Sequence, residues 1–84
     1  MKKLEKLKKR IIYRSSYRGT KEMDILLSSF VEKYVNILNE KDLNELEELL
    51  NLEDEVIYNF FYKGITHSFF DKRKIGKLLK DFKL

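Results

Sequence analysis

Apolar residues recur along much of this chain with the spacing of α-helices. The clearest run lies between residues 23 and 38, where apolar side chains repeat at intervals of three and four residues over about four turns. Its members are Met23, Leu26, Leu27, Phe30, Val31, Tyr34 and Leu38. Such spacing places the apolar side chains on one face of a helix, so this segment is predicted to form a helix of the core.

Shorter patterns of the same kind predict four more helices, one before this segment and three after it. The apolar positions are Leu4, Leu7 and Ile11 in the first; Leu43, Leu46, Leu49 and Leu50 in the third; Val56, Ile57, Phe60 and Phe61 in the fourth; Ile75, Leu78, Leu79 and Phe82 in the fifth. No segment alternates apolar and polar residues for long enough to predict a strand.

Residues that start and stop helices lie between these segments. The Lys-rich first helix is expected to end between Ser15 and Gly19, where Gly19 gives the backbone freedom for a corner. Thr20 and Asn39 are suitable N-caps, and Asp54 is suited to open the fourth helix. Gly64 is suited to end it. The fifth helix is predicted to start near residue 68 or 71. The expected fold is all-α, a compact single-domain bundle of about five short helices over residues 1–84.

The composition offers little to an enzyme or a metal site. The chain has no cysteine, which excludes disulfides and thiolate ligands, and it has one histidine, His67. His67 is expected in the turn before the last helix, and no metal site is predicted because carboxylates would have to supply nearly every ligand. Gly19, Gly64 and Gly76 are too far apart to form a phosphate-binding loop.

Carboxylates are common in the middle of the chain but indicate no acid–base pair. Glu45, Glu47 and Glu48 have the spacing of a solvated face on the third helix. We therefore expect no catalytic and no cofactor-binding residue.

No apolar stretch approaches the roughly 20 residues that cross a bilayer. The basic start contains Glu5 and continues directly into helical periodicity, which disfavours a transit peptide. The expectation is a cytoplasmic protein without membrane insertion.

Charge is unevenly distributed, with a net of +8 in residues 1–21, −9 in residues 22–62 and +5 in residues 63–84. The basic ends can pack against the acidic middle, or both signs can face a partner. Tyr13 and Tyr17 lie among basic residues and suit nucleic-acid stacking. The second to fourth segments are not basic enough for a recognition helix, so nucleic-acid binding is disfavoured.

The corner between the first two helices holds Arg18, Gly19, Glu22 and Asp24. One interpretation is local: glycine makes the turn, and both carboxylates favour the positive end of the next helix. The other is a partner-binding cluster, because an arginine fork binds carboxylates and phosphates with two hydrogen bonds. The residues alone leave both open.

In this position the four residues complete the pattern RGxxExD, and residues 54–60 follow the form D-x-x-L-Y-x-W. This order resembles the bacterial FAD assembly factors of succinate dehydrogenase, whose mitochondrial relatives are called succinate dehydrogenase assembly factor 2. The resemblance covers about residues 5–64, and residues 65–84 are similar only in their expected helix. Thr20, Ile57 and Phe60 replace the family's usual Met, Leu and Trp, and the last two replacements keep bulky apolar side chains for packing.

The resemblance implies a chaperone that is not itself an enzyme. Such proteins bind the flavoprotein subunit of succinate dehydrogenase, and often that of fumarate reductase, and promote covalent attachment of FAD to a histidine of that subunit. His67 is then not the acceptor, and the chain needs no cofactor of its own. Arg18, Gly19, Glu22 and Asp24 are the implied partner-binding residues, although Asp24 is also placed to hold the corner together. Gly19→Arg is expected to abolish client binding and to leave helicity intact.

A small basic nucleic-acid-binding or antitoxin-like interaction module is the alternative. The salt dependence of binding to RNA or DNA separates the first from an assembly factor.

Overall fold

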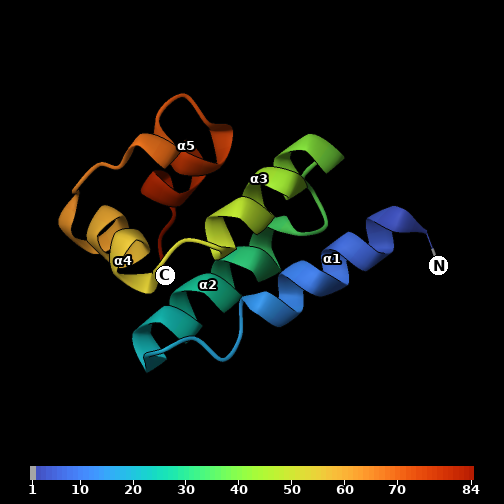
Figure 1. The fold of residues 1–84 in the computed structure, drawn as a ribbon, viewed down its shortest axis with the longest axis horizontal. Helices are drawn as coiled ribbons and strands as arrows, with labels where there is room; N and C mark the ends of the chain where they lie inside the picture. Colours follow the sequence, from blue (N-terminus) through green and yellow to red (C-terminus); the bar gives the residue numbers. More distant parts are fainter. Residues whose placement is uncertain (1) are drawn as a thin grey trace.

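Helices are the regular elements throughout residues 2–84, the part of the chain that the computed structural model describes (Figure 1). They are α1 (Lys3–Arg14), α2 (Lys21–Tyr34), α3 (Glu40–Leu50), α4 (Asp54–Lys63) and α5 (Lys74–Asp81), with one 3₁₀ turn, η1 (Ser68–Phe70), before α5. The predicted all-α fold with five helices is confirmed.

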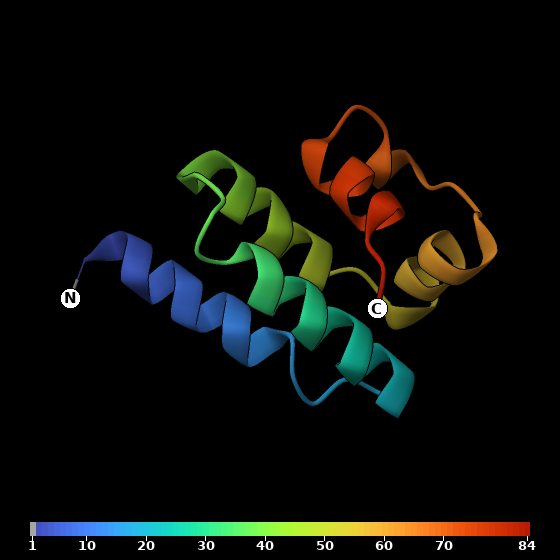
Figure 2. The ribbon, with the colours of Figure 1, turned by 180° about the vertical axis from the view of Figure 1, so that it is seen from behind.

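The first three helices lie alongside one another, and α4 and α5 cover one end of this group (Figures 1 and 2). Helix α3 packs against both α1 and α5 and is therefore central to the bundle. The first turn of α1 extends beyond its neighbours (Figure 2). Leu4, which was predicted to face the core, is accordingly half-exposed, whereas Leu7 and Ile11 are buried.

One continuous core contains buried side chains from all five helices. The predicted stripe of α2 is its largest part, and Phe30 is fully buried there. The Phe82 ring, just after α5, meets Phe30 edge-on with centroids 5.2 Å apart, so the end of the chain folds back onto α2. Ile57 is fully buried, and the Phe60 ring stacks on Phe70 at 3.8 Å. Both residues therefore contribute the apolar packing expected of them.

The predicted caps at the starts of α2 and α3 are confirmed. Thr20 Oγ1 accepts a hydrogen bond from the Met23 amide at 3.2 Å, and Asn39 Oδ1 accepts one from the Asp42 amide at 2.9 Å. Gly64 ends α4 with a left-handed φ of 68°, as its position predicted. The amides of Met23 and Asp42 and the carbonyl of Asn59, which lack partners within a regular helix end, thus have partners close by in the sequence.

Gly19 has a different structural role from the predicted one. The left-handed residue of the corner is Tyr17, with φ 59°, and Gly19 does not have a positive φ. A Cβ atom on Gly19 would lie 3.3 Å from Asp54 Oδ2. The close approach of Asp54, on α4, therefore explains the glycine at position 19, and the left-handed backbone is required two residues earlier, at Tyr17.

The last helix begins at Lys74, later than the sequence predicted. His67 lies in the connection before it, as expected, and its Nδ1 accepts a hydrogen bond from the Phe69 amide at 3.1 Å. This bond caps the single turn of η1. Lys72 then adopts a left-handed φ of 62°, which a continuous helix cannot contain.

Basic residues at both ends of the chain pair with the acidic α3. Arg10 Nε lies 2.6 Å from Glu47 Oε2, and Lys74 Nζ lies 3.3 Å from Asp42 Oδ2. The ends therefore do pack against the middle. The prediction of a solvated face is wrong for two of its three glutamates. The Glu47 side chain, paired with Arg10 of α1, is 17% exposed, and Glu45 Oε1 is buried.

The Arg10–Glu47 pair makes stability depend on pH. The hydrogen bond from Arg10 holds the pKa of Glu47 below its ordinary value, although burial acts against this. The unfolded chain therefore binds the proton at a higher pH than the folded chain, and the stabilisation is lost as pH falls through the lowered pKa. Urea unfolding between about pH 6 and about pH 3 should show a steeper loss for the wild type than for Arg10→Gln. Parallel profiles would mean that the pair contributes nothing.

Gly76 is required by the packing of η1 on α5. A Cβ atom there would lie 2.5 Å from the Phe70 carbonyl oxygen. Gly76→Ala should lower the free energy of unfolding by about 1–3 kcal/mol through overpacking, even though alanine is the better helix former. Urea unfolding against the exposed neighbour Lys77→Ala tests this, and an unchanged or higher stability for Gly76→Ala would contradict it.

Candidate functional site

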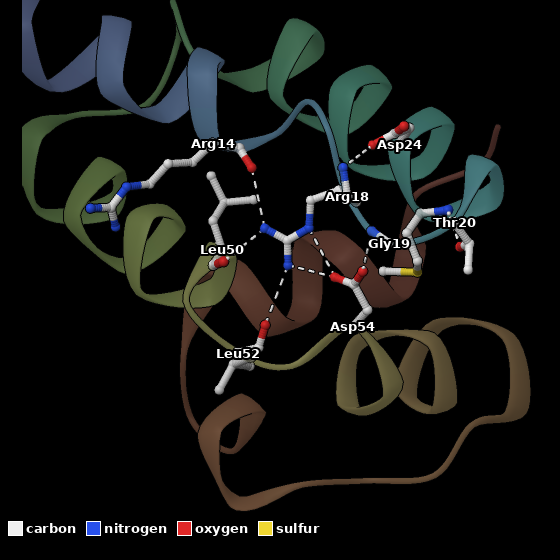
Figure 3. A network of polar contacts seen from close by, with 9 residues as sticks. Arg14, Arg18, Gly19, Thr20, Asp24, Leu50, Leu52 and Asp54 are labelled. Carbon is white, nitrogen blue, oxygen red and sulfur yellow. Dashed lines mark hydrogen bonds and ion pairs between the residues drawn. The ribbon is translucent and has the colours of Figure 1, made fainter.

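The Arg18 side chain points into the bundle, where it meets the start of α4 (Figure 3). Its Nη2 lies 2.6 Å from Asp54 Oδ1, and its Nε donates to the same oxygen at 2.9 Å. Only 13% of the Arg18 side chain is exposed. The charge of Arg18 is therefore paired within the fold, as the local interpretation of this corner requires, and its role in partner binding stays a prediction.

The same guanidinium satisfies carbonyl groups at the ends of two other helices. It donates to the Arg14 carbonyl at 3.2 Å, the last residue of α1. It also donates to the Leu50 and Leu52 carbonyls, at 2.9 Å and 3.3 Å, where α3 ends. Carbonyls at a helix C-terminus lack partners in their own helix and carry partial negative charge, so a cation suits them. One side chain thus joins the ends of α1 and α3 to the start of α4.

The backbone of the corner is held by two carboxylates. Asp24 Oδ1 accepts a hydrogen bond from the Arg18 amide, so Asp24 does hold the corner together. Asp54 Oδ2 accepts one from the Gly19 amide at 3.0 Å. Both oxygens of Asp54 therefore have partners in the segment that leads into α2.

Asp54 also belongs to this site, which the sequence alone did not predict. It opens α4 as predicted, but Glu53 takes the N-cap position and the Asp54 carboxylate is directed to Arg18 and Gly19. The sequence did contain one signal. The RGxxExD motif has a basic residue, Arg18, at one helix end, and the motif at residues 54–60 has an acidic residue, Asp54, at another. Nothing in the sequence paired those two ends.

Gly19 and Glu22 remain on the surface of the corner. Tyr58 and Tyr62 are also exposed, and their rings lie 4.7 Å apart. These two tyrosines follow Asp54 at intervals of four residues and so share its face of α4. Burial raises the pKa of Tyr62, and Tyr58 and the Glu22 carboxylate raise it further. The hydrogen bond from the Gly19 amide to Asp54 Oδ2 holds the segment that leads into α2 against the start of α4. We call Gly19, Glu22, Tyr58 and Tyr62 the corner face.

A shallow depression of about 450 Å³ lies beside the corner, between the end of α1 and the connection from α3 to α4. Its lining is largely polar and includes Tyr17, Asn51 and Glu53. Within residues 2–84, no group of three His, Asp or Glu side chains is placed to hold a metal ion. The same part of the chain contains no helix with the length and apolar character to cross a membrane. The corner offers a carboxylate and two phenols, which are groups suited to a polar protein contact.

The ion pair between Arg18 and Asp54 should contribute much of the stability of this corner. Asp54→Asn keeps the shape but leaves the Arg18 charge without its counterion, and we expect a loss of about 2–3 kcal/mol in the free energy of unfolding. Chemical denaturation at neutral pH measures it. Glu47→Gln is the matched control, because it also neutralises a carboxylate paired with arginine, but at an exposed partner. Equal losses in the two variants would show that the burial of Arg18 adds nothing.

Comparison with known proteins identifies relatives over most of the chain. A family model described as "Flavinator of succinate dehydrogenase" matches residues 9–83, a range that includes η1 and α5. The mitochondrial succinate dehydrogenase assembly factor 2 of Saccharomyces cerevisiae strain S288c is 44% identical over 78 residues, which cover 92% of this chain and 48% of that protein. The protein of the same name in Scheffersomyces stipitis is 42% identical over 72 residues, which cover 84% of this chain and 48% of that protein.

A protein of that name in Dictyostelium discoideum is 38% identical over 60 residues, or 71% of this chain and 43% of its own length. The chain thus spans about half the length of the relatives it matches. The family model covers far more than half of the chain, and it includes every residue of the corner face. This chain belongs to the family of flavinators of succinate dehydrogenase.

Proposed function

We propose that this chain binds the flavoprotein subunit of succinate dehydrogenase and promotes the covalent attachment of FAD to it. The observation that carries the proposal is the family match over residues 9–83. The relatives that align with this chain are named as assembly factors of succinate dehydrogenase. The exposed corner face gives the proposal a surface on which a client can be bound.

In this proposal the four residues of the RGxxExD motif divide into two pairs. Arg18 and Asp24 position the corner, because their charged groups are bound within the fold. Gly19 and Glu22 contact the client, because both lie on the surface. Glycine keeps the backbone accessible, and Glu22 offers a carboxylate to a donor on the client. An arginine at position 19 would obstruct this surface and would also press on Asp54, whose oxygen lies so close.

The action that we propose requires only selective binding. A client with several domain arrangements shifts toward whichever arrangement the factor binds more tightly, by the ratio of the two affinities. A tenfold preference corresponds to about 1.4 kcal/mol, which one or two additional polar contacts can supply. In this scheme the flavoprotein provides the histidine and the groups that form the bond to flavin. The chain contributes no catalytic group and holds no cofactor.

The range of clients and the compartment follow from the same proposal. We propose a factor of the bacterial type that acts in the cytoplasm, and the flavoprotein subunit of fumarate reductase is a second client to test. The relatives compared above are named as mitochondrial proteins. Cell fractionation with an antibody against the chain measures its location directly.

Flavin fluorescence of the denatured flavoprotein subunit, separated on a gel, tests the proposal, since only covalently held FAD stays with the denatured chain. Deletion of this gene should remove most of the fluorescent band, and the wild-type gene should restore it. Glu22→Ala should restore it poorly, because the contacting carboxylate is lost. Glu48→Ala is the matched control, because Glu48 is an exposed glutamate on α3, outside the corner face.

An undiminished band after deletion would overturn the assembly role. Full rescue by Glu22→Ala would keep the role but remove Glu22 from the contact. If the purified chain instead binds RNA with an affinity that falls steeply with salt, the nucleic-acid alternative takes its place.

A further inference from the structure

A second concave surface lies between α4, η1 and α5, away from the corner face. It has a volume of about 820 Å³, and none of its lining residues also lines the depression beside Arg18. Its apolar floor contains Phe60 and Phe70, and its charged rim comprises Lys72, Arg73, Lys74, Lys77 and Lys80 together with Asp71 and Asp81. We call this surface the C-terminal groove. The proposed function gives it no role.

The floor of the groove is fixed by close packing. Phe60 and Phe70 stack face to face, with ring centroids 3.8 Å apart and planes at 12°. Phe70 is buried, whereas Phe60 keeps part of its ring accessible. Gly76 allows the backbone of η1 to lie directly against α5. The floor is therefore a preformed apolar surface that needs no rearrangement before binding.

The rim carries more positive charge than the fold uses. Lys74 is paired with Asp42, and the Arg73 guanidinium lies 4.5 Å from the Phe69 ring centroid. The other three cations, Lys72, Lys77 and Lys80, form no ion pair with any residue in the described range 2–84. Within the described residues, three ammonium groups thus stand around an apolar floor without an ion-pair partner.

We propose that the C-terminal groove binds an acidic peptide segment of a partner protein. Carboxylates of the segment pair with the rim lysines, and an aromatic or aliphatic side chain between them covers Phe60. The size of the groove favours a segment of several residues, because a single small anion would leave most of the volume and the whole apolar floor unused. Lys77 and Lys80 lie one turn apart along α5, which suits carboxylates spaced along a chain.

The charge pattern also argues against a nucleotide as the occupant. Binding a diphosphate usually relies on backbone amides of a glycine-rich loop, and the groove has no such loop. Asp71 and Asp81 stand at its rim and would repel a compact polyanion, whereas a peptide can place its backbone amides near them. This inference does not depend on the proposed function, since an acidic segment of any partner satisfies it.

Fluorescence anisotropy with the full chain tests the proposal. The probe is a fluorescein-labelled peptide, Glu-Asp-Phe-Glu-Asp, titrated with the wild type and with the double variant Lys77→Glu/Lys80→Glu. The double variant should bind about tenfold more weakly or worse, since two attractive contacts become repulsive. The matched control is Lys6→Glu/Lys9→Glu, which changes the net charge equally, with the same residue spacing, on exposed positions of α1. It should bind within about twofold of the wild type.

Several outcomes would overturn the proposal. Equal weakening by both double variants would mean that the probe follows net charge alone, and no binding by the wild type would remove the site. A probe with Ser in place of Phe that binds equally well would remove the apolar contact. Displacement of the probe by ADP at lower concentrations than by unlabelled peptide would identify a nucleotide site instead.

Circular dichroism checks that the double variant is folded, and the neutral pair Lys77→Gln/Lys80→Gln provides the same comparison if it is not. The flavoprotein is absent from every one of these measurements. Failure of the peptide proposal therefore leaves the proposed function unaffected, and a failed flavinylation test leaves the groove unaffected.

Discussion

The guanidinium of Arg18 is the contact on which the geometry of this small bundle depends. An arginine carries five N–H donors in a rigid plane, and here they reach the carbonyl ends of α1 and α3 and the first carboxylate of α4. Each of these groups would be costly to leave unpaired near the core. A small core leaves little free energy to spare, so a single residue that satisfies three helix ends carries unusual weight.

This fixed corner gives the proposed binding surface its shape. The Asp54 carboxylate is held by Arg18 and in turn holds the Gly19 amide, so the start of α2 is fixed against α4. Glu22 and the tyrosine pair of α4 then keep a constant relation to each other. A factor that works by selecting one arrangement of its client benefits from such rigidity, because little conformational entropy is lost when it binds. Residues that never touch the client can thus be as necessary as those that do.

Local patterns in the sequence were sufficient for the helices and for most of their ends. Spacing located the apolar stripes, and Thr20, Asn39 and Gly64 act where their chemistry placed them. The failures at the candidate site concern contacts between residues far apart in the chain. Arg18 and Asp54 are separated by 36 positions, and no local rule connects them. The turn interpretation of Gly19 failed for the same reason, because the constraint comes from a carboxylate of another helix.

The uneven charge distribution shows how one sequence feature serves two purposes. Part of the basic charge at each end is used in packing, through Arg10 and Lys74 on the acidic α3. The remaining lysines of α5, Lys77 and Lys80, line the groove floored by Phe60 and form no ion pair with α3. Unpaired ammonium groups add repulsion and little stability, so their concentration around an apolar floor is better explained by a bound partner than by the fold.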